Sequence, residues 1–235
     1  MGELPVFDDV PAIGDGARWE TLFDEAFAGE PRVRHRAFTW DRPDGELGAA
    51  REEFGARGYV LDEMVGLVAE AAGLRPHARE NRDVELRALD PNGDEDLWDG
   101  VVEVQVAGRA PVFEEAAHRT FCRGRQRELR RLFEAGHGTW YVALLPGTRE
   151  VAGSCGIVVT DGRGRYKAVD TALAHRRAGI CSRLVVEASR LSTEAFGTER
   201  FVIVADAGYH ALGLYESLGF ERRERVGEVL LMPAE

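Results

Sequence analysis

The stretch AHRRAGICSRLVVEAS, residues 174–189, joins two arginines and a glycine to an amphipathic pattern. Its apolar residues recur at the spacing of one helix face, which predicts a helix from about residue 177 to residue 196. Gly197 follows at a position where helices commonly end. The predicted helix therefore begins beside positive charge, at the end that normally attracts Asp or Glu.

Arg176 and Arg177 at this helix start indicate an anion site. A cation in the first turn costs about 0.3–1 kcal/mol unless an anion lies between the side chain and the main chain. The guanidinium groups and the free N–H groups from Arg177 to Ser182 would then donate to the same anion, and Gly179 would let a phosphate approach the main chain closely. We expect a phosphate group to bind here.

Among phosphate ligands, the pattern favours coenzyme A. A P-loop requires Gly-Lys-Ser or Gly-Lys-Thr, and the chain's only lysine, Lys167, lies on the preceding strand. The Gly-x-Gly-x-x-Gly turn of dinucleotide sites is absent between this strand and helix. Coenzyme A remains, because its pyrophosphate has to be held and not cleaved.

The elements around this stretch predict an α/β (α+β) protein with a mixed, mostly antiparallel central sheet flanked by helices. Hairpin-linked strands lead into a strand–helix–strand crossover, which requires one parallel pair whose strands end at Thr171 and Ala205. Ligands bind at such strand ends in open α/β sheets. The predicted order is strand 83–89, helices 94–108 and 111–136, strands 139–146, 150–160 and 165–173, the helix from 177, a strand 200–205 covered on both faces, helix 208–220, and two short strands around Gly227.

Composition narrows the class of protein. The net charge of −11 over 235 residues disfavours general nucleic-acid binding, and no apolar run approaches the roughly 20 residues of a membrane span. The acidic N-terminus lacks a secretory leader, so we expect a cytoplasmic protein. Cys122, Cys155 and Cys181 show no metal-ligand spacing, so we expect reduced thiols and no metal.

Two motifs carry a resemblance to a known family. The run R-R-A-G-I-C (176–181) resembles the Arg/Gln-x-x-Gly-x-Gly/Ala acyl-CoA loop of the GNAT superfamily of N-acetyltransferases. The run ALGLYESLGF (211–220) resembles that superfamily's later helix, which usually ends in Leu-Tyr-x-x-x-Gly-Phe. The resemblance implies acetyl-CoA as co-substrate and transfer of an acetyl or other acyl group to a primary amine, by direct attack in a ternary complex.

The resemblance also assigns residues. Tyr215 matches the acid that protonates the departing thiolate, a role that suits a phenol near pKa 10. Cys181 stands where Gly or Ala is usual. Val169 and Thr171 would pair with the pantetheine arm, one amide there polarising the thioester, and the pyrophosphate would bind to Arg176, Arg177, Ala178, Gly179, Ile180, Cys181 and Ser182.

The general base is predicted from position. Asp170 stands on the strand end beside the expected thioester and is our candidate, acting directly or through water. Asp206, His210 and Glu103 are weaker candidates.

An internal repeat organises the chain. At a constant separation of 161 positions, Phe54 corresponds to Tyr215, Gly58 to Gly219 and Tyr59 to Phe220, while strand 36–41 resembles 201–206 if four residues are inserted. Residues 1–68 then resemble the closing half of another GNAT domain, without an Arg-x-x-Gly loop and with Phe54 in place of the tyrosine. The expected domains are an accessory, non-catalytic half (1–68), a linker (69–81) and a complete acyl-CoA domain (82–235).

Two function classes stay open at this stage. One is an acyl-CoA-dependent N-acyltransferase that acts on a small-molecule amine or a peptide. The other is a non-catalytic module that senses acyl-CoA or regulates a partner. The sequence identifies neither the acceptor nor the acyl chain length, and it leaves both a monomer and a homodimer open.

Overall fold

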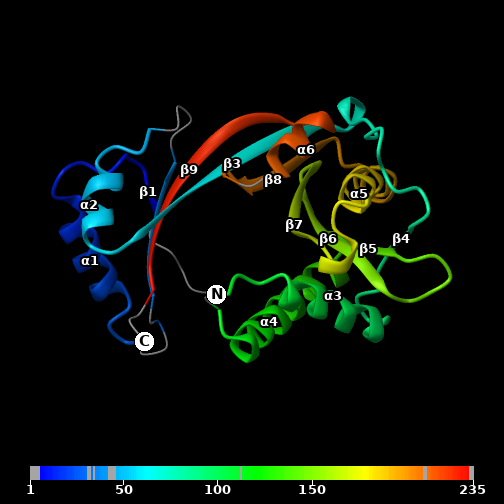
Figure 1. The fold of residues 1–235 in the computed structure, drawn as a ribbon, viewed down its shortest axis with the longest axis horizontal. Helices are drawn as coiled ribbons and strands as arrows, with labels where there is room; N and C mark the ends of the chain where they lie inside the picture. Colours follow the sequence, from blue (N-terminus) through cyan, green and yellow to red (C-terminus); the bar gives the residue numbers. More distant parts are fainter. Residues whose placement is uncertain are drawn as a thin grey trace. The chain divides into compact units, whose positions relative to one another are not determined.

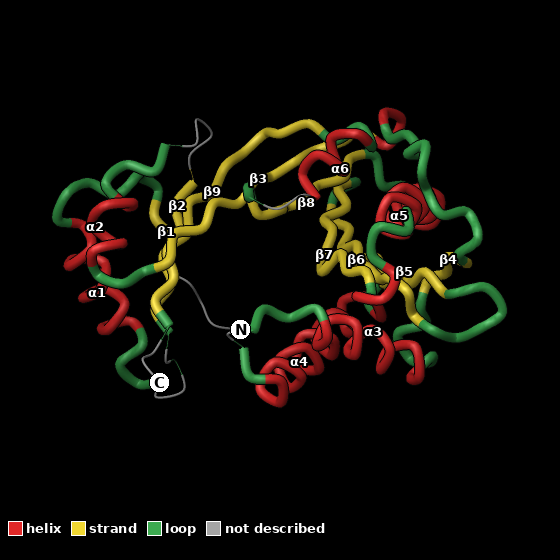
Figure 2. Tube along the Cα trace, viewed as in Figure 1, coloured by secondary structure: helices red, strands yellow, loops and turns green. Residues whose placement is uncertain are grey.

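The computed structural model describes residues 6–30, 33, 35–41, 46–111, 113–208 and 211–232. Helices and strands alternate along most of the chain (Figure 1; Figure 2). The elements are β1 (Val6–Phe7), α1 (Asp15–Ala26), β2 (Arg36–Asp41), α2 (Ala50–Ala56), β3 (Val60–Glu70), the short 3-10 helix η1 (Ala71–Gly73), β4 (Glu85–Ala88), α3 (Glu95–Ala107), α4 (Glu115–Glu134), β5 (Gly138–Leu144), β6 (Val151–Thr160), β7 (Arg163–Thr171), the 3-10 helix η2 (Leu173–His175), α5 (Ile180–Phe196), β8 (Arg200–Asp206), α6 (Ala211–Ser217) and β9 (Glu221–Leu231).

The described strands form one mixed sheet in the order β1-β2-β9-β3-β8-β7-β6-β5-β4. The pairs β4/β5, β5/β6, β6/β7 and β2/β9 are antiparallel, while β7/β8 and β1/β2 are parallel. The predicted fold class is therefore confirmed, with the parallel pair where the crossover through α5 requires it.

The chain divides into two compact units. One combines residues 1–67 with 204–212 and 222–235, and the other combines residues 68–203 with 213–221. The first has an aromatic core in which Trp19 stacks on Phe7 at 3.8 Å between ring centroids, around the fully buried Phe38 and Trp40. The predicted division into functional domains at 68 and 82 stays a prediction.

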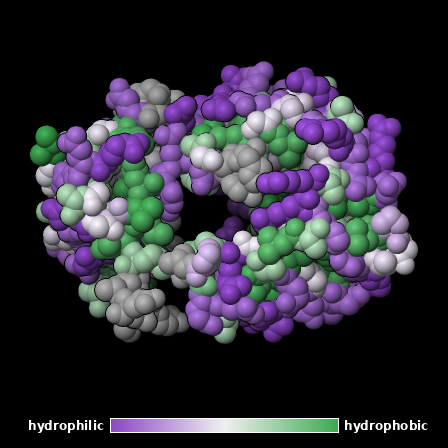
Figure 3. All heavy atoms as spheres, in the orientation of Figure 1, coloured by the Kyte–Doolittle hydropathy of each residue, from purple (hydrophilic) through white to green (hydrophobic). Residues whose placement is uncertain are grey.

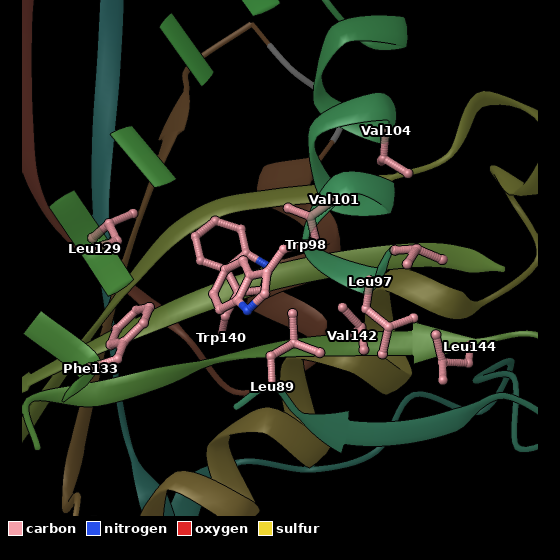
Figure 4. Close-up of a cluster of buried hydrophobic side chains, with 11 residues drawn as sticks. Leu89, Leu97, Trp98, Val101, Val104, Leu129, Phe133, Trp140, Val142 and Leu144 are labelled. Carbon is pink, nitrogen blue, oxygen red and sulfur yellow. The ribbon is translucent and has the colours of Figure 1, made fainter. Parts of the chain in front are cut away.

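In the second unit, helices cover both faces of the sheet. α3 and α4 pack on one face through a core that includes Trp98 and Trp140, whose rings lie 6.0 Å apart (Figure 4). α5 covers the other face, where a β-carbon at Gly153 would contact Ile180 at 3.2 Å and Leu184 at 3.6 Å. Hydrophilic side chains cover much of the surface that Figure 3 shows, and no described helix combines the length and apolarity needed to cross a membrane.

The strand β7 changes course near its end. Lys167 pairs with Gly156 and Asp170 pairs with Ser154, so two β7 residues, Ala168 and Val169, face one residue of β6. Ala168 has a left-handed φ of 45°, as such a β-bulge allows. The parallel register with β8 covers only residues 163–165 and 200–202, so the main chains of these described strands separate beyond it.

The predicted repeat is visible in the element bounds. α2 and α6, and likewise β3 and β9, begin and end 161 positions apart. Their turns match bond by bond: the Tyr59 amide donates to the Phe54 carbonyl at 3.0 Å, and the Phe220 amide to the Tyr215 carbonyl at 3.1 Å. Gly58 and Gly219, which precede Tyr59 and Phe220, also correspond to each other and both have a positive φ, of 85° and 108°.

The two repeats exchange their last strands. Each is a strand–helix–strand segment, β2-α2-β3 and β8-α6-β9, yet β9 pairs with β2 and β3 lies next to β8. β3 and β9 are neighbours at the centre of the arrangement, where Arg225 donates to Glu63 at 2.8 Å. Neither repeat therefore completes its own part of the sheet.

Several local predictions were wrong. The strand 200–205 is covered on one face only, since Val204 is 37% exposed. The chain ends in one continuous strand, β9, because Gly227 leaves room for the Trp40 ring and the strand passes over it. α4 begins at Glu115 and not near Pro111, because the Glu114 carboxylate accepts the N–H groups of the first turn and caps the helix there.

Candidate acyl-CoA site

The loop before α5 leaves a row of amides free. α5 begins at Ile180, three residues later than predicted, because Arg177 and Gly179 have left-handed φ angles of 62° and 76°. Within the described residues, the N–H groups of 177–182 donate to no main-chain or side-chain acceptor, and the first amide of the helix with a partner is that of Arg183, on the Gly179 carbonyl. Amides at a helix N-terminus bind anions well, since the helix dipole adds to their hydrogen bonds.

Gly179 has a packing role that the sequence did not predict. A β-carbon there would lie 2.1 Å from the Arg79 carbonyl oxygen and 2.9 Å from the Asn81 nitrogen. The Asn81 amide donates to the Gly179 carbonyl at 3.0 Å. The glycine therefore makes room for the chain's own main chain on this side, and its predicted role at a phosphate stays a prediction.

The segment 69–81, predicted as a linker, is tied to the second unit at both ends. It starts with the last residues of β3 and with η1. Arg75 donates its amide to the Leu218 carbonyl at 3.0 Å, and a β-carbon at Gly219 would lie 2.4 Å from the Gly73 carbonyl oxygen. Residues 73–75 thus support the end of α6, as residues 79–81 support the start of α5.

Arg176 and Arg177 are both exposed at the head of this loop. The Arg176 Nε lies 3.4 Å from the Thr171 carbonyl oxygen, and its guanidinium lies near Gly108 at the end of α3. Ser182 is buried and its hydroxyl donates to the Gly179 carbonyl at 2.9 Å, which closes the first turn of the helix. The loop thus joins positive charge to free amides, as an anion requires.

Asp170 lies beside this loop. Burial raises the pKa of its carboxyl above the ordinary 3.8, although the charge of Arg176 and a hydrogen bond from Gln105 of α3 act in the opposite direction. A half-buried carboxylate with a raised pKa is a stronger base than a solvated one. The structure therefore brings together Asp170 and Arg176, which the sequence assigned to different tasks.

The three cysteines are free thiols, and the charge of Asp170 acts on each of them. Burial and the negative charge of Asp170 raise the pKa of Cys181 to about 12, and the same two effects raise the pKa of Cys122 and Cys155. Such thiols are not nucleophiles near neutral pH. Within the described residues, no group of three or more His, Cys, Asp or Glu side chains could hold a metal.

Tyr215 lies on α6 in the core of the second unit and is 5% exposed. Its ring centroid is 6.2 Å from that of Phe220, whose ring in turn lies 6.2 Å from that of Tyr166. The role of Tyr215 as an acid stays a prediction. Among the weaker base candidates, Glu103 forms an ion pair with Arg119, Asp206 is exposed and accepts the Gly208 amide at 2.7 Å, and His210 lies outside the described residues.

Sequence reasoning missed three residues next to Asp170. Gln105 contacts the carboxylate from α3. Ser154, its partner in the β6/β7 register, is fully buried and its hydroxyl has no hydrogen-bond partner among the described residues. Lys167 lies on the same strand, and burial and neighbouring arginines lower its pKa to about 8. For Lys167, the one signal in the sequence is that it is the only lysine in the chain.

Solved structures with this fold cover nearly the whole chain. A conserved protein of unknown function from Staphylococcus epidermidis aligns at a TM-score of 0.74 with 14% identity, over 97% of this chain and 84% of that one. A GCN5-related N-acetyltransferase from Sphaerobacter thermophilus aligns at 0.62 with 17% identity, over 94% and 69%. A tandem GNAT protein from the clavulanic acid biosynthesis pathway aligns at 0.58 with 15% identity, over 92% and 70%.

These identities show the fold alone, whereas the sequence itself matches a family. The comparison with curated proteins gave no match. Residues 109–220 match the acetyltransferase (GNAT) family, a span that runs from just after α3 to the residue before β9 and includes the free-amide loop. The similarity to the GNAT acetyltransferase family therefore covers residues 109–220 of this chain.

Proposed function

We propose that the protein is an N-acyltransferase that moves an acetyl group, or another short acyl group, from acyl-CoA to a primary amine in a ternary complex. The observation that carries this proposal is the row of free amides at residues 177–182, which begins beside the exposed Arg176 and Arg177 and comes shortly after β7, whose pairing with β8 ends at Arg165. A diphosphate fits such donors. The edge of β7 beyond residue 165 fits an extended pantetheine arm.

The bound acyl-CoA supplies the activated carbonyl group, and the chain's residues do the rest. Val169 and Thr171 at the strand edge orient the thioester, and Arg176, Arg177 and the amides of Ala178, Ile180 and Cys181 hold the diphosphate. Asp170 accepts the proton of the incoming amine, since its raised pKa suits this task. Tyr215 gives a proton to the leaving thiolate.

Binding of CoA tests the first half of this proposal. In calorimetry with purified protein, Arg176→Glu and Arg177→Glu should each weaken CoA binding at least tenfold, because each reverses a charge beside the diphosphate. Arg123→Glu is the matched control, at an exposed arginine of α4 that pairs with Asp99. Undiminished CoA affinity in both loop variants would disprove the site.

Turnover distinguishes the enzyme from the alternative, a non-catalytic acyl-CoA sensor. Release of free thiol from acetyl-CoA over a panel of amines should depend on the amine, and Tyr215→Phe should lower kcat about 10²–10⁴-fold with binding unchanged. The Phe variant should fold, because Phe54 occupies the matching place in the first repeat with the same turn hydrogen bonds. CoA binding without thiol release would favour the sensor.

A further inference from the structure

We propose that Lys167, Arg165 and Arg125 form an anion-binding cluster for the acceptor, which is then an amine carrying a carboxylate or phosphate a few bonds from its nitrogen. This inference rests on the proposed function, since it names the substrate class of the same site. The positions of these cations, their lack of acidic partners and their spacing from Asp170 carry it.

Lys167 and Arg165 lie on the face of the sheet that α3 and α4 cover. Lys167 pairs with Gly156 and Arg165 with Val158 of β6, and directly paired residues share a face. Val158 packs against the core between the sheet and helices α3 and α4, and a β-carbon at Gly156 would contact the Trp140 ring of that core. Both cations are therefore on the α3/α4 side.

The third cation comes from α4. Cys122 and Leu129 are buried on this helix, Cys122 against Val102 and Val106 of α3 and Leu129 in the core that contains Trp98 and Trp140. Arg125 falls three residues after the first and four before the second, so it belongs to the same stripe. The charge of Arg125 lowers the pKa of Lys167 and acts in the same direction on the thiol of Cys122, so its guanidinium lies near both side chains.

Among the described residues, Lys167, Arg165 and Arg125 have no acidic side chain to balance their charge, whereas several arginines of α4 do. On the same helix, Arg130 pairs with Glu95 at 2.5 Å and Arg119 pairs with Glu103 and Glu115. Across the part of the chain that the structure describes, Lys167, Arg165 and Arg125 form no ion pair or side-chain hydrogen bond, in a protein of net charge −11. A bound anion would offset both the repulsion and the desolvation of the ammonium group.

The distance to the base sets the size of the acceptor. Lys167 and Asp170 lie opposite β6 residues that are two apart, Gly156 and Ser154, so both side chains are on one face about 7 Å apart along the strand. An amine whose nitrogen reaches Asp170 and whose acidic group reaches Lys167 is therefore a small molecule such as an amino acid. A polyamine lacks the second group.

The single lysine makes a direct test available. In protein carrying ¹³C,¹⁵N-lysine, the side-chain signal belongs to Lys167 alone. Without CoA, succinate should raise the pKa of Lys167 from about 8 by at least one unit, because an anion favours the charged form. Putrescine at the same ionic strength should not. Arg125→Gln should weaken the succinate effect at least threefold, while the control Arg123→Gln should leave it unchanged.

Kinetics test the same cluster under turnover. The wild-type protein should have a higher kcat/KM for glycine and β-alanine than for the corresponding amides. Lys167→Met should reduce this preference at least tenfold by raising the KM for the acids. Lys167→Arg should restore most of the preference. A Lys167 signal that succinate leaves unmoved would overturn the inference. So would a signal that responds to succinyl-CoA but not to free acids, since the anion would then belong to the acyl donor.

The two proposals fail in different ways. If CoA binds and thiol is released while acids and amides react alike in wild type and Lys167→Met, the enzyme stands and the anion-binding cluster is wrong. If CoA does not bind, the proposed function is wrong, and the succinate titration still reports on the cluster.

Discussion

Gly179 lies against the main chain of Arg79, so closely that a β-carbon on the glycine would come within 2.1 Å of the arginine's carbonyl oxygen. Gly179 also has a left-handed φ of 76°. Two separate constraints, one of packing and one of backbone conformation, therefore require glycine at the residue that precedes α5.

Gly179→Ala should lower the free energy of unfolding by about 2–5 kcal/mol, from a left-handed alanine and from overpacking. It should also abolish CoA binding, since residues 79–81 would push the loop aside. Gly197→Ala, at the other end of α5, is the control, because Gly197 has a φ of 65° but a β-carbon there would meet nothing within 4 Å. That control should cost only about 1–2 kcal/mol and retain CoA binding. Denaturant titration and calorimetry compare the two, and equal losses of stability would contradict the packing argument.

The repeat offers a matched pair of glycines. A β-carbon at Gly227 would lie 2.3 Å from the buried Trp40 ring, so Gly227→Ala should cost about 1–3 kcal/mol. Its counterpart Gly66 would meet Glu224 only at 3.4 Å, and Gly66→Ala should be neutral or stabilise by about 0.5–1 kcal/mol. Urea unfolding followed by tryptophan fluorescence measures both. A neutral Gly227→Ala would mean that β9 can move away from Trp40.

The pH dependence of turnover should report Asp170. Burial raises the pKa of this carboxyl above 3.8, so the rate should fall on the acid side at a pH above that value, as the base becomes protonated. Asp170→Asn should remove this acid limb and lower kcat about 10²–10⁴-fold. Asp206→Asn is the comparison, and loss of the limb in that variant would transfer the role to Asp206.

Lys167 should make stability rise with pH. Its pKa is about 8 in the folded chain against an ordinary 10.5, so between these values the unfolded chain holds a proton that the folded chain has lost. Stability then increases with pH in this window, at no more than about 1.4 kcal/mol per pH unit. Lys167→Met should lack this slope, which denaturant titrations at pH 7.5, 8.5 and 9.5 would detect. Identical slopes in the two proteins would mean that the lysine is solvated.

The sequence predicted the elements that depend on local signals. The helix that ends at Gly197, the hairpins and the crossover can be predicted from hydrophobic periodicity and from turn residues. Both signals involve residues only a few positions apart in the sequence. The repeat is also visible in the sequence, because matching residues recur 161 positions apart, and the structure shows that Gly58 and Gly219 have the same left-handed conformation. These features need no knowledge of distant contacts.

What the sequence missed depends on contacts between distant residues. Nothing near Gly179 shows that residues 79–81 lie against it, and nothing near Gly227 shows the Trp40 ring. The surroundings of Asp170 come from α3, α4, β6 and α5 together, so the raised pKa and the cluster around Lys167 emerge only in the folded chain. Val204 looked buried because apolar strands usually are, yet one face of β8 is open.

Because the two repeats exchange strands, the second repeat cannot be separated from the first without exposing a strand edge. A fragment beginning at residue 82 would keep every motif of the acyl-CoA loop, yet β8 would lose its neighbour β3 and present an unpaired edge. Such an edge invites aggregation or pairing with a second chain. The first repeat thus supplies a strand that the second one needs, because without β3 the hydrogen-bonding groups on that side of β8 would lose their partner.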